Sequence, residues 1–272
     1  MERPEHEGEH GPLAFPPIYH PEKSVLATAG AGDVFAAWVE NPGNQDDIYA
    51  AGSSDEGRTW SAGRRVNTDL GASRQLNPAI AADSTAVYVA WEDRRNGDED
   101  IYFARSTDSG GNWSDPNLRV DDDIGSANQH SPSLFATPSG LSAVWVDSRR
   151  GDDDIRHANS ADGGVAWSAS TRVNSDTGVS DQRDPVVAVD ANGEIHVAWW
   201  DAHETGFHIY FASTAWTIVE DPTAQPPASG PLPWWLVLLI VGLVTAVVIL
   251  VMVWARRRRT RVGPFGGAPP TR

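Results

Sequence analysis

The chain has 272 residues, of which 40% are hydrophobic, so it can bury a core and does not belong to the disordered class of proteins. All 37 acidic residues and 15 of the 21 basic ones precede Trp234, which gives this front part a net charge of −22. A domain this acidic repels phosphate backbones, which argues against nucleic-acid binding. The chain has no cysteine, which excludes disulfides, thiolate metal sites and a cysteine nucleophile.

Residues 1–20 are polar and show no periodic pattern, so we expect them to be unstructured. His6 and His10, with Glu7 and Glu9 between them, could suggest a metal site. A disordered terminus accounts for the same residues without a metal, and we favour that interpretation.

The region 21–220 is built from an internal repeat. Four tryptophans recur at intervals of 53, 54 and 54 residues: Trp38, Trp91, Trp145 and Trp199. Alternating apolar residues predict four short strands in each unit, for example 78–83 as a first strand and 100–106 as a third. The fourth strand is expected to run from a later tryptophan to an Arg-Val pair. A four-stranded repeat of this length is typical of a propeller blade, whereas a sandwich domain needs about 100 residues.

An eight-residue motif, Ser-x-Asp-x-Gly-x-x-Trp, occurs three times between the third and fourth strands. Its residues are Ser53, Asp55, Gly57 and Trp60, then Ser106, Asp108, Gly110 and Trp113, then Ser160, Asp162, Gly164 and Trp167. The aspartate can accept hydrogen bonds from backbone amides of its own turn, and the glycine allows positive φ. The tryptophan can fold back over the hairpin. The fourth repeat lacks the motif at 211–216, which leaves open whether its blade is complete.

These motifs match the Asp boxes, or BNR repeats, of sialidases, and the chain resembles a membrane-anchored member of the sialidase-like β-propeller family over about residues 21–216. The resemblance implies an all-β fold of four-stranded antiparallel blades. Its four repeats of about 54 residues would form part of a six-bladed propeller, with a closed four-bladed ring as the alternative. In that family the Asp box is structural, so it indicates little about chemistry.

Resemblance to sialidases also implies an arginine triad, a Tyr–Glu nucleophile pair and an aspartate acid/base. The Arg-Ile-Pro element that opens sialidase domains is absent. Of the five tyrosines, only Tyr19 lies outside the repeating strands. The arginines Arg65, Arg119 and Arg172 occupy equivalent repeat positions, which favours a structural role. No catalytic residue can therefore be assigned, and whether the chain is an enzyme stays open.

The loops opposite the Asp boxes are the candidate ligand face. Their candidate residues are Asp93, Arg95, Asp98 and Asp100 in one repeat and Asp147, Arg149, Asp152 and Asp154 in the next. Carboxylates at alternate positions around a glycine could bind Ca²⁺, although arginines stand where ligands would be needed. We favour Asp93–Arg95 and Asp147–Arg149 ion pairs that form across a hairpin and stay solvated, with Ca²⁺ at these carboxylates as the alternative. No other cofactor is expected.

The C-terminal part predicts a membrane anchor. Residues 221–233 contain five prolines and are expected to form a stiff linker. Residues 234–254 carry no charge, and as a helix of 21 residues they would span about 30 Å, the thickness of a bilayer core. The tail 255–272 begins with an arginine cluster, which predicts a cytoplasmic tail and a propeller outside the cell.

Export needs a signal sequence, and the first residues show neither a basic nor an apolar region of that kind. We therefore expect N-terminal blades and a signal sequence to be missing, with a cytosolic, tail-anchored domain as the alternative. The leading hypothesis is a non-catalytic module of the cell surface that binds a glycan or a protein. The alternatives are an exo-α-sialidase or other glycoside hydrolase completed by missing blades, and a structural envelope protein.

Overall fold

A computed structural model describes residues 22–30, 32–42, 45–175, 180–202 and 208–213. The chain divides into two compact units, Met1–Val219 and Glu220–Arg272, and every described strand belongs to the first. Within the described ranges no helix is long and apolar enough to cross a membrane. The predicted terminal segment 1–20, the linker 221–233, the apolar segment 234–254 and the tail 255–272 lie outside these ranges.

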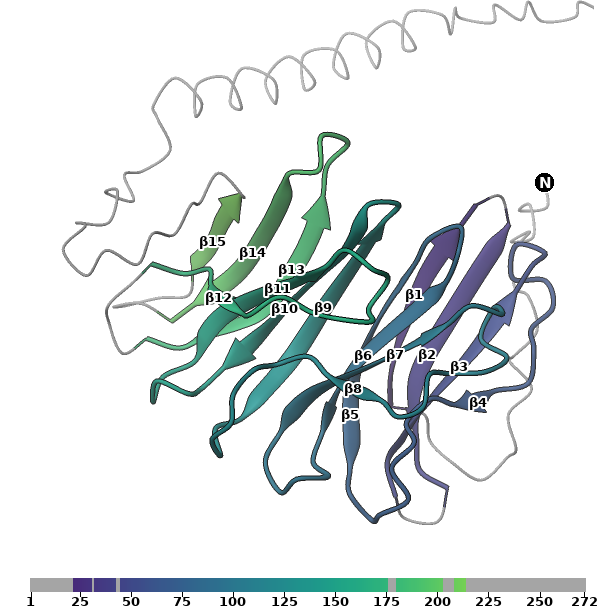
Figure 1. The fold of residues 1–272 in the computed structure, drawn as a ribbon, viewed down its shortest axis with the longest axis horizontal. Coiled ribbons are helices and arrows are strands. Elements are labelled where there is room, and N and C mark those ends of the chain that lie inside the picture. The colour runs from purple at the N-terminus through teal and green to yellow at the C-terminus, as the bar shows by residue number, and fades with distance from the viewer. Residues whose placement is uncertain (1–21, 31, 43–44, 176–179, 203–207, 214–272) are drawn as a thin grey trace, which may run out of the picture. The chain divides into compact units, whose positions relative to one another are not determined.

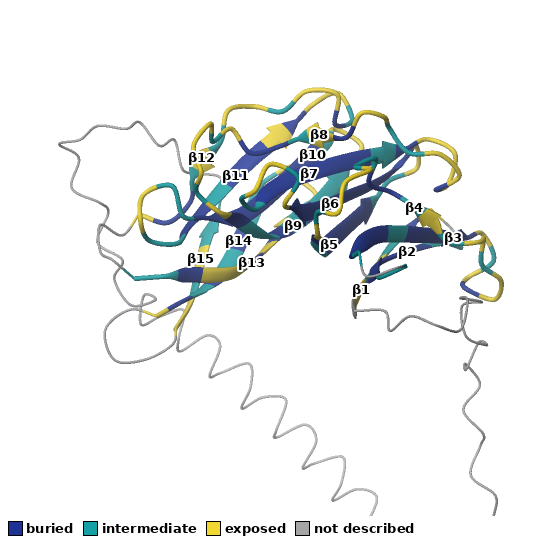
Figure 2. Cartoon of the chain, turned by 90° about the horizontal axis from the view of Figure 1, so that it is seen from below, coloured by how far each residue is buried: buried dark blue, intermediate teal, exposed yellow. Residues whose placement is uncertain are grey.

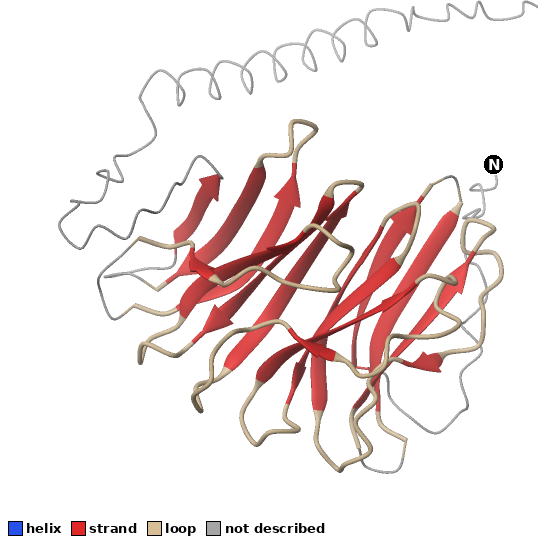
Figure 3. Ribbon diagram, in the orientation of Figure 1, coloured by secondary structure: helices blue, strands red, loops and turns tan. Residues whose placement is uncertain are grey.

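Four antiparallel sheets follow one another along the chain, and each is called a blade here (Figures 1 and 3). Blade 1 holds β1 (Glu22–Ala29), β2 (Asp33–Glu40), β3 (Asp47–Ser53) and β4 (Arg64–Arg65); blade 2 holds β5 (Gln75–Ala82), β6 (Val87–Asp93), β7 (Asp100–Ser106) and β8 (Leu118–Arg119). Blade 3 holds β9 (Gln129–Thr137), β10 (Gly140–Asp147), β11 (Asp154–Ser160) and β12 (Thr171–Arg172); blade 4 holds β13 (Gln182–Val189), β14 (Ile195–Asp201) and β15 (His208–Ser213). The predicted all-β chain of antiparallel, mostly four-stranded units is confirmed for the described residues.

The fourth strand is much shorter than the sequence predicts. It has two residues in each of the first three blades, as in β4, and blade 4 shows three strands in its described part. In blade 1, Ser61 N donates to Gly52 O at 2.8 Å and Val66 N donates to Ile48 O at 2.7 Å. Between these bonds only Arg64 and Arg65 pair with β3, because the residues after the Asp box are still completing its turn.

The first strand of every blade carries a bulge near its start. The register shifts there, and one residue at each bulge has positive φ: Lys23, Asn77, Ser131 and Asp184. A bulge turns a side chain out of the regular alternation of a strand and is common beside functional sites. The four bulges therefore redirect side chains at one end of the blades.

The core consists of apolar clusters between consecutive blades. The first strands lie next to one another in the order β1, β5, β9 and β13, and their blades pack face to face. Large members of the clusters are Ile48 with Trp91, Phe103 with Trp145, and Val144 with Trp199. Figure 2 shows the burial concentrated in the strands and the exposure in the loops. Among the described strands β13 makes no comparable contact with β1, so these four blades form no closed ring.

Candidate functional site

The three Asp boxes share one hydrogen-bond pattern. In the second box, Ser106 Oγ donates to Asp108 Oδ1 at 2.7 Å and accepts from Gly110 N at 2.9 Å. Asp108 Oδ1 also accepts from Asn112 N at 2.8 Å. These bonds hold the pKa of Asp108 down, at about 2. The carboxylate organises its own turn, which leaves it little capacity for a ligand.

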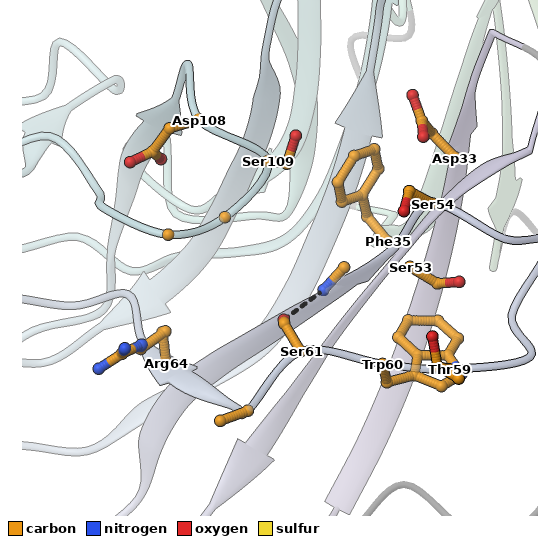
Figure 4. Close-up of a pocket in the computed structure, with 14 residues that line it drawn as sticks. Asp33, Phe35, Ser53, Ser54, Thr59, Trp60, Ser61, Arg64, Asp108 and Ser109 are labelled. Carbon is orange, nitrogen blue, oxygen red and sulfur yellow. Dashed lines mark hydrogen bonds between the residues drawn. The ribbon is translucent and has the colours of Figure 1, made fainter.

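A pocket of about 450 Å³ opens between the boxes of blades 1 and 2 (Figure 4). Phe35, Trp60 and Asp108 help to line it, and Gly52 forms part of its wall. In the next groove along, Arg105 takes the place of Gly52 and donates to Gly163 O of blade 3 at 3.3 Å. At Gly52 the backbone of blade 2 comes so close that a Cβ would lie 2.9 Å from Ser109 O, so the glycine allows the close approach of the two blades. Gly52 N donates to Ser61 Oγ at 3.0 Å, so the polar groups of this pocket mostly serve its turns.

On the opposite end of the blades, Asp93 and Arg95 form a paired unit. Arg95 Nε lies 2.9 Å from Asp93 Oδ1, and its Nη2 lies 2.6 Å from Asp93 Oδ2. Trp91 Nε1 donates to the same carboxylate at 2.9 Å, and the guanidinium lies 4.0 Å from the ring centre of Tyr102. The ion pair is formed as expected, but the expectation that it stays solvated is wrong, because Asp93 is fully buried between its tryptophan and arginine partners and cannot reach a ligand.

Asp147 and Arg149 repeat this arrangement in blade 3. Arg149 Nε and Nη2 each lie 2.8 Å from Asp147, and Trp145 Nε1 donates to Asp147 at 3.2 Å. Arg149 Nη1 also reaches Asp122 at 2.8 Å, on the connection that leaves blade 2. Asp122 in turn accepts from Ser170 N at 2.8 Å. The arginine therefore ties neighbouring blades together.

The carboxylates suggested for Ca²⁺ do not come together as a ligand set. Asp100 is buried and lies 2.7 Å from Arg119, and Asp154 is buried and lies 3.2 Å from Arg172. Neither they nor Asp98 and Asp152 belong to a group with metal-ligand spacing. In the described ranges one such group exists, formed by Asp190, Glu194 and His196 at a hairpin turn. Each buried carboxylate already faces a cation within its own blade, so the arrangement favours the predicted ion pairs over the calcium alternative.

Glu92 forms the centre of a different cluster at this end of the blades. It is 4% exposed, and its Oε1 accepts from Asn77 Nδ2 and from Ser131 N, both at 2.7 Å. These donors belong to the bulges of β5 and β9, so one carboxylate joins blades 2 and 3. Burial raises the pKa of Glu92, although both hydrogen bonds oppose the shift.

His130 extends the cluster toward blade 4. Its Nε2 lies 3.9 Å from Asp153 Oδ2, and Arg183 Nε lies 3.7 Å from the same oxygen. Burial disfavours the charged imidazole, but Asp153, Glu92 and Glu99 outweigh that effect and raise the pKa of His130. His130 is also the first cause that lowers the pKa of Asp153. We call Asn77, Glu92, His130, Ser131, Asp153 and Arg183 the inner-strand cluster.

Two positions of the inner-strand cluster, those of Glu92 and His130, differ from blade to blade. Where blade 2 has Glu92, the equivalent positions in the other blades are Val39, Val146 and Trp200. The position of His130 is Glu22 in blade 1, Leu76 in blade 2 and Arg183 in blade 4. The blades fold with any of these residues, so the fold itself does not require an acid or an imidazole there. The variation at these two positions, together with the contacts between blades, marks the cluster as the candidate site.

No protein-family model matches the sequence, and no curated protein does. Solved structures match the fold. A protein of unknown function from Dyadobacter fermentans DSM 18053 has a TM-score of 0.54 at 15% identity, covering 71% of this chain and 66% of that one. The GH93 α-L-arabinofuranosidase of Fusarium graminearum, solved with arabinobiose, has a TM-score of 0.58 at 15% identity, covering 73% and 64%. The Hadza microbial sialidase Hz136 has a TM-score of 0.53 at 18% identity, covering 70% and 43%.

The described blades have the β-propeller fold that they share with the arabinofuranosidase and the sialidase. This chain spans about two thirds of the length of the first two structures and less than half of the third. The six-bladed count stays a prediction. Identities this low carry the fold alone, so the activities of these neighbours are not transferred to this chain.

Sequence reasoning missed the inner-strand cluster because it searched for sialidase-type tyrosines and arginines. Glu92 lies directly beside the repeated Trp91 and was taken as part of a repeated strand. An alignment of the four repeats, position by position, would have shown that the residues at the positions of Glu92 and His130 differ from blade to blade. The sequence alone could not show that the bulges bring Glu92 and His130 into one cluster. A bulge shifts the register of a strand by one residue, and its position is not evident from the sequence.

Proposed function

We propose that this chain is a membrane-anchored, cell-surface propeller that binds a glycan through the inner-strand cluster and has no complete catalytic set of its own. The observation that carries the proposal is that Glu92, His130 and Arg183, which stand at positions that differ from blade to blade, lie in one cluster. Carboxylate, imidazole and guanidinium groups suit the hydroxyls of a sugar. Trp200 lies beside Arg183, 5.7 Å from guanidinium to ring centre, and supplies an aromatic surface.

The structural neighbours support the same class of ligand. One was solved with arabinobiose and another is a sialidase, so proteins of this fold act on glycans. Membrane attachment is proposed from the uncharged segment 234–254 and the arginines that follow it.

A glycan array tests the proposal with the full chain in detergent micelles. For the best glycan found, His130→Ala and Arg183→Ala should each weaken binding about tenfold, which is about 1.4 kcal/mol. Arg64→Ala is the matched control, because Arg64 is exposed at the opposite end of blade 1. A chain that binds no glycan, or one whose binding ignores both cluster variants, would contradict the proposal.

A glycoside hydrolase is the second candidate, and Glu92 favours it. A carboxyl group whose pKa is raised by burial is suited to general acid catalysis, and glycosidases use a pair of carboxyl groups. Release of 4-nitrophenol from a panel of aryl glycosides, including arabinofuranosides and sialosides, measures this activity. Hydrolysis by the wild type that is lost in Glu92→Gln would establish glycosidase activity. Glycan binding without any hydrolysis would exclude the glycoside hydrolase candidate.

A further inference from the structure

Consecutive blades are joined by a buried amide network, and we call each such network a joint. Between blades 1 and 2, Asn67 Nδ2 donates to Asp47 Oδ1 at 2.9 Å and to Gln75 Oε1 at 3.1 Å. One side-chain amide therefore supplies hydrogens to a carboxylate and to a glutamine oxygen. The joint between blades 3 and 4 has the same two bonds, both at 2.8 Å, from Asn174 Nδ2 to Asp154 Oδ1 and to Gln182 Oε1.

The joint between blades 2 and 3 has an aspartate in place of the asparagine. Asp121 Oδ2 accepts from Ile101 N at 2.9 Å. The asparagine oxygens of the other joints accept from the equivalent amides, so Asp121 Oδ1 stands where their nitrogen would be. The glutamine of this joint, Gln129, is fully buried, and its Oε1 has no hydrogen-bond partner among the described residues. The acceptor that an asparagine serves in the other joints is therefore left without a donor.

This joint also carries an additional buried negative charge. Arg119 Nη2 lies 2.7 Å from Asp100 Oδ1 and 2.6 Å from Asp121 Oδ1, so two carboxylates share one guanidinium. Asp100 is 2% exposed and Asp121 is 5% exposed. In the other joints one aspartate faces the equivalent arginine, and the neutral asparagine adds no charge. A buried carboxylate without a cation of its own costs so much free energy that it binds a proton instead.

The neighbouring charged groups do not supply another cation. Asp123 accepts from Gln129 Nε2 at 3.4 Å and adds negative charge. The same bond favours this orientation of the amide, because turning it would bring Gln129 Oε1 against the carboxylate of Asp123. Tyr102, which pairs with Arg119 across β7 and β8, is itself an acid. The two buried aspartates beside the joint are each paired with an arginine, Asp93 with Arg95 and Asp147 with Arg149.

We propose that Asp121 holds a proton in the folded protein at neutral pH and donates it to Gln129 Oε1, as the asparagine donates in the other joints. A protonated carboxyl group supplies the missing donor, and it leaves Arg119 to compensate Asp100 alone. Burial raises the pKa of Asp121 and that of Asp100, which supports a proton held by this pair. The joint is complete in its protonated form and weakens when the proton leaves. This proton site is independent of the proposed glycan binding.

The proton makes the stability of the domain depend on pH above the acid range. An aspartate in the unfolded chain loses its proton at about pH 4, whereas the folded joint keeps the proton to a higher pH. Folding therefore takes up one proton in this window, and the folded state loses stability as the pH rises through it. From this site alone, the equilibrium constant for unfolding should rise by up to about tenfold per pH unit.

Urea unfolding of the full chain between pH 4 and pH 8 tests the proposal. Asp121→Asn supplies the donor without the titrating proton, so the unfolding constant of the wild type should increase relative to that of this variant as the pH rises. Asn67→Asp is the reciprocal variant at the first joint, and it should acquire the pH dependence that Asp121→Asn loses. A ratio of wild type to Asp121→Asn that stays constant over this range would overturn the proposal.

Infrared spectroscopy gives a second measurement, made on the folded protein at pH 7. The wild type should show the C=O stretch of a protonated carboxyl group that Asp121→Asn loses, and Asn67→Asp should gain one. Glu92 is also a buried carboxyl group, so the band of Asp121 must persist in Glu92→Gln. A spectrum that Asp121→Asn leaves unchanged would overturn the proposal. Stabilisation by Ca²⁺ that sodium at equal ionic strength does not reproduce, and that Asp121→Asn removes, would assign these oxygens to a cation and also overturn it.

Discussion

At the scale of single residues, the glycine of the third Asp box serves both its turn and the blade before it. Gly164 has φ of +85°, which residues with a Cβ rarely adopt. A Cβ on Gly164 would lie 2.3 Å from the ring of Phe103 in blade 2. The motif therefore forms a contact between blades in addition to its turn. This contact restricts the side chain allowed at position 164 more strongly than the turn does.

We expect Gly164→Ala to destabilise the domain more than Gly193→Ala. Gly193 has nearly the same φ, +83°, but a Cβ there would meet no atom within 4 Å. Both variants lose about 1–2 kcal/mol to the left-handed backbone, and Gly164→Ala loses about 1–3 kcal/mol more to the clash with Phe103. Urea unfolding of both variants measures the difference. Equal losses would show that Phe103 moves aside freely.

The Asp boxes also predict a response to acid. The pKa of Asp108 is lowered from 3.8 to about 2, chiefly by the amide of Asn112. A lowered pKa in the folded state stabilises the fold above about pH 4, and this contribution is lost as the pH falls through about 2. Asp108→Asn should therefore lose less stability than the wild type between pH 4 and pH 2. Thermal unfolding at several pH values measures this, and identical acid profiles would contradict it.

At the scale of elements, the blades are joined at one end by ion pairs and at the other by Asp boxes. Trp145, Asp147 and Arg149 form a chain of contacts from the strand β10 to the loop that follows it. Asp147 is fully buried, so its charge depends on Arg149 for compensation. Asp147 and Arg149, which the sequence suggested as ligand residues, thus stabilise the loops at the end of the blades where the inner-strand cluster lies.

Arg149→Ala is expected to destabilise the domain by about 3 kcal/mol, because it leaves a buried carboxylate without its cation. A loss of about 1 kcal/mol lowers the melting temperature by roughly 2–4 °C in a domain of this size. Arg150→Ala is the control, since the side chain of Arg150 is 58% exposed and lies 3.6 Å from Asp154. Similar melting temperatures for the two variants would show that Asp147 does not need Arg149.

At the scale of the whole molecule, charge separates the two ends of the chain. The part before Trp234 is strongly acidic, and six arginines and no acid follow it. This asymmetry suits a tethered domain outside the cell with a basic cytoplasmic end. The linker 221–233 would then be accessible to proteases, because proline-rich segments of this kind form extended spacers.

Protease added to intact cells should release the domain by cleavage within 221–233, while an epitope placed after Arg261 stays protected until the cells are permeabilised. Immunoblots against the domain and the epitope give the measurement. Protection of both parts before permeabilisation would favour a cytosolic, tail-anchored domain in place of the proposed one.

The sequence by itself determined the repeat, the four-stranded antiparallel units and the positions of the three Asp boxes. These depend on local patterns, since the period of two and the turn residues are set by neighbours in the chain. Only the tertiary structure decided that β4 is two residues long, that Asp93 and Asp147 are buried, and that Glu92 meets Ser131 of the next blade. It likewise decided that Phe211 is exposed where Phe103 is buried. Contacts between blades join residues that are distant in the sequence. Whether such a contact forms depends on the neighbouring blade, and the sequence of a single repeat does not encode that neighbour.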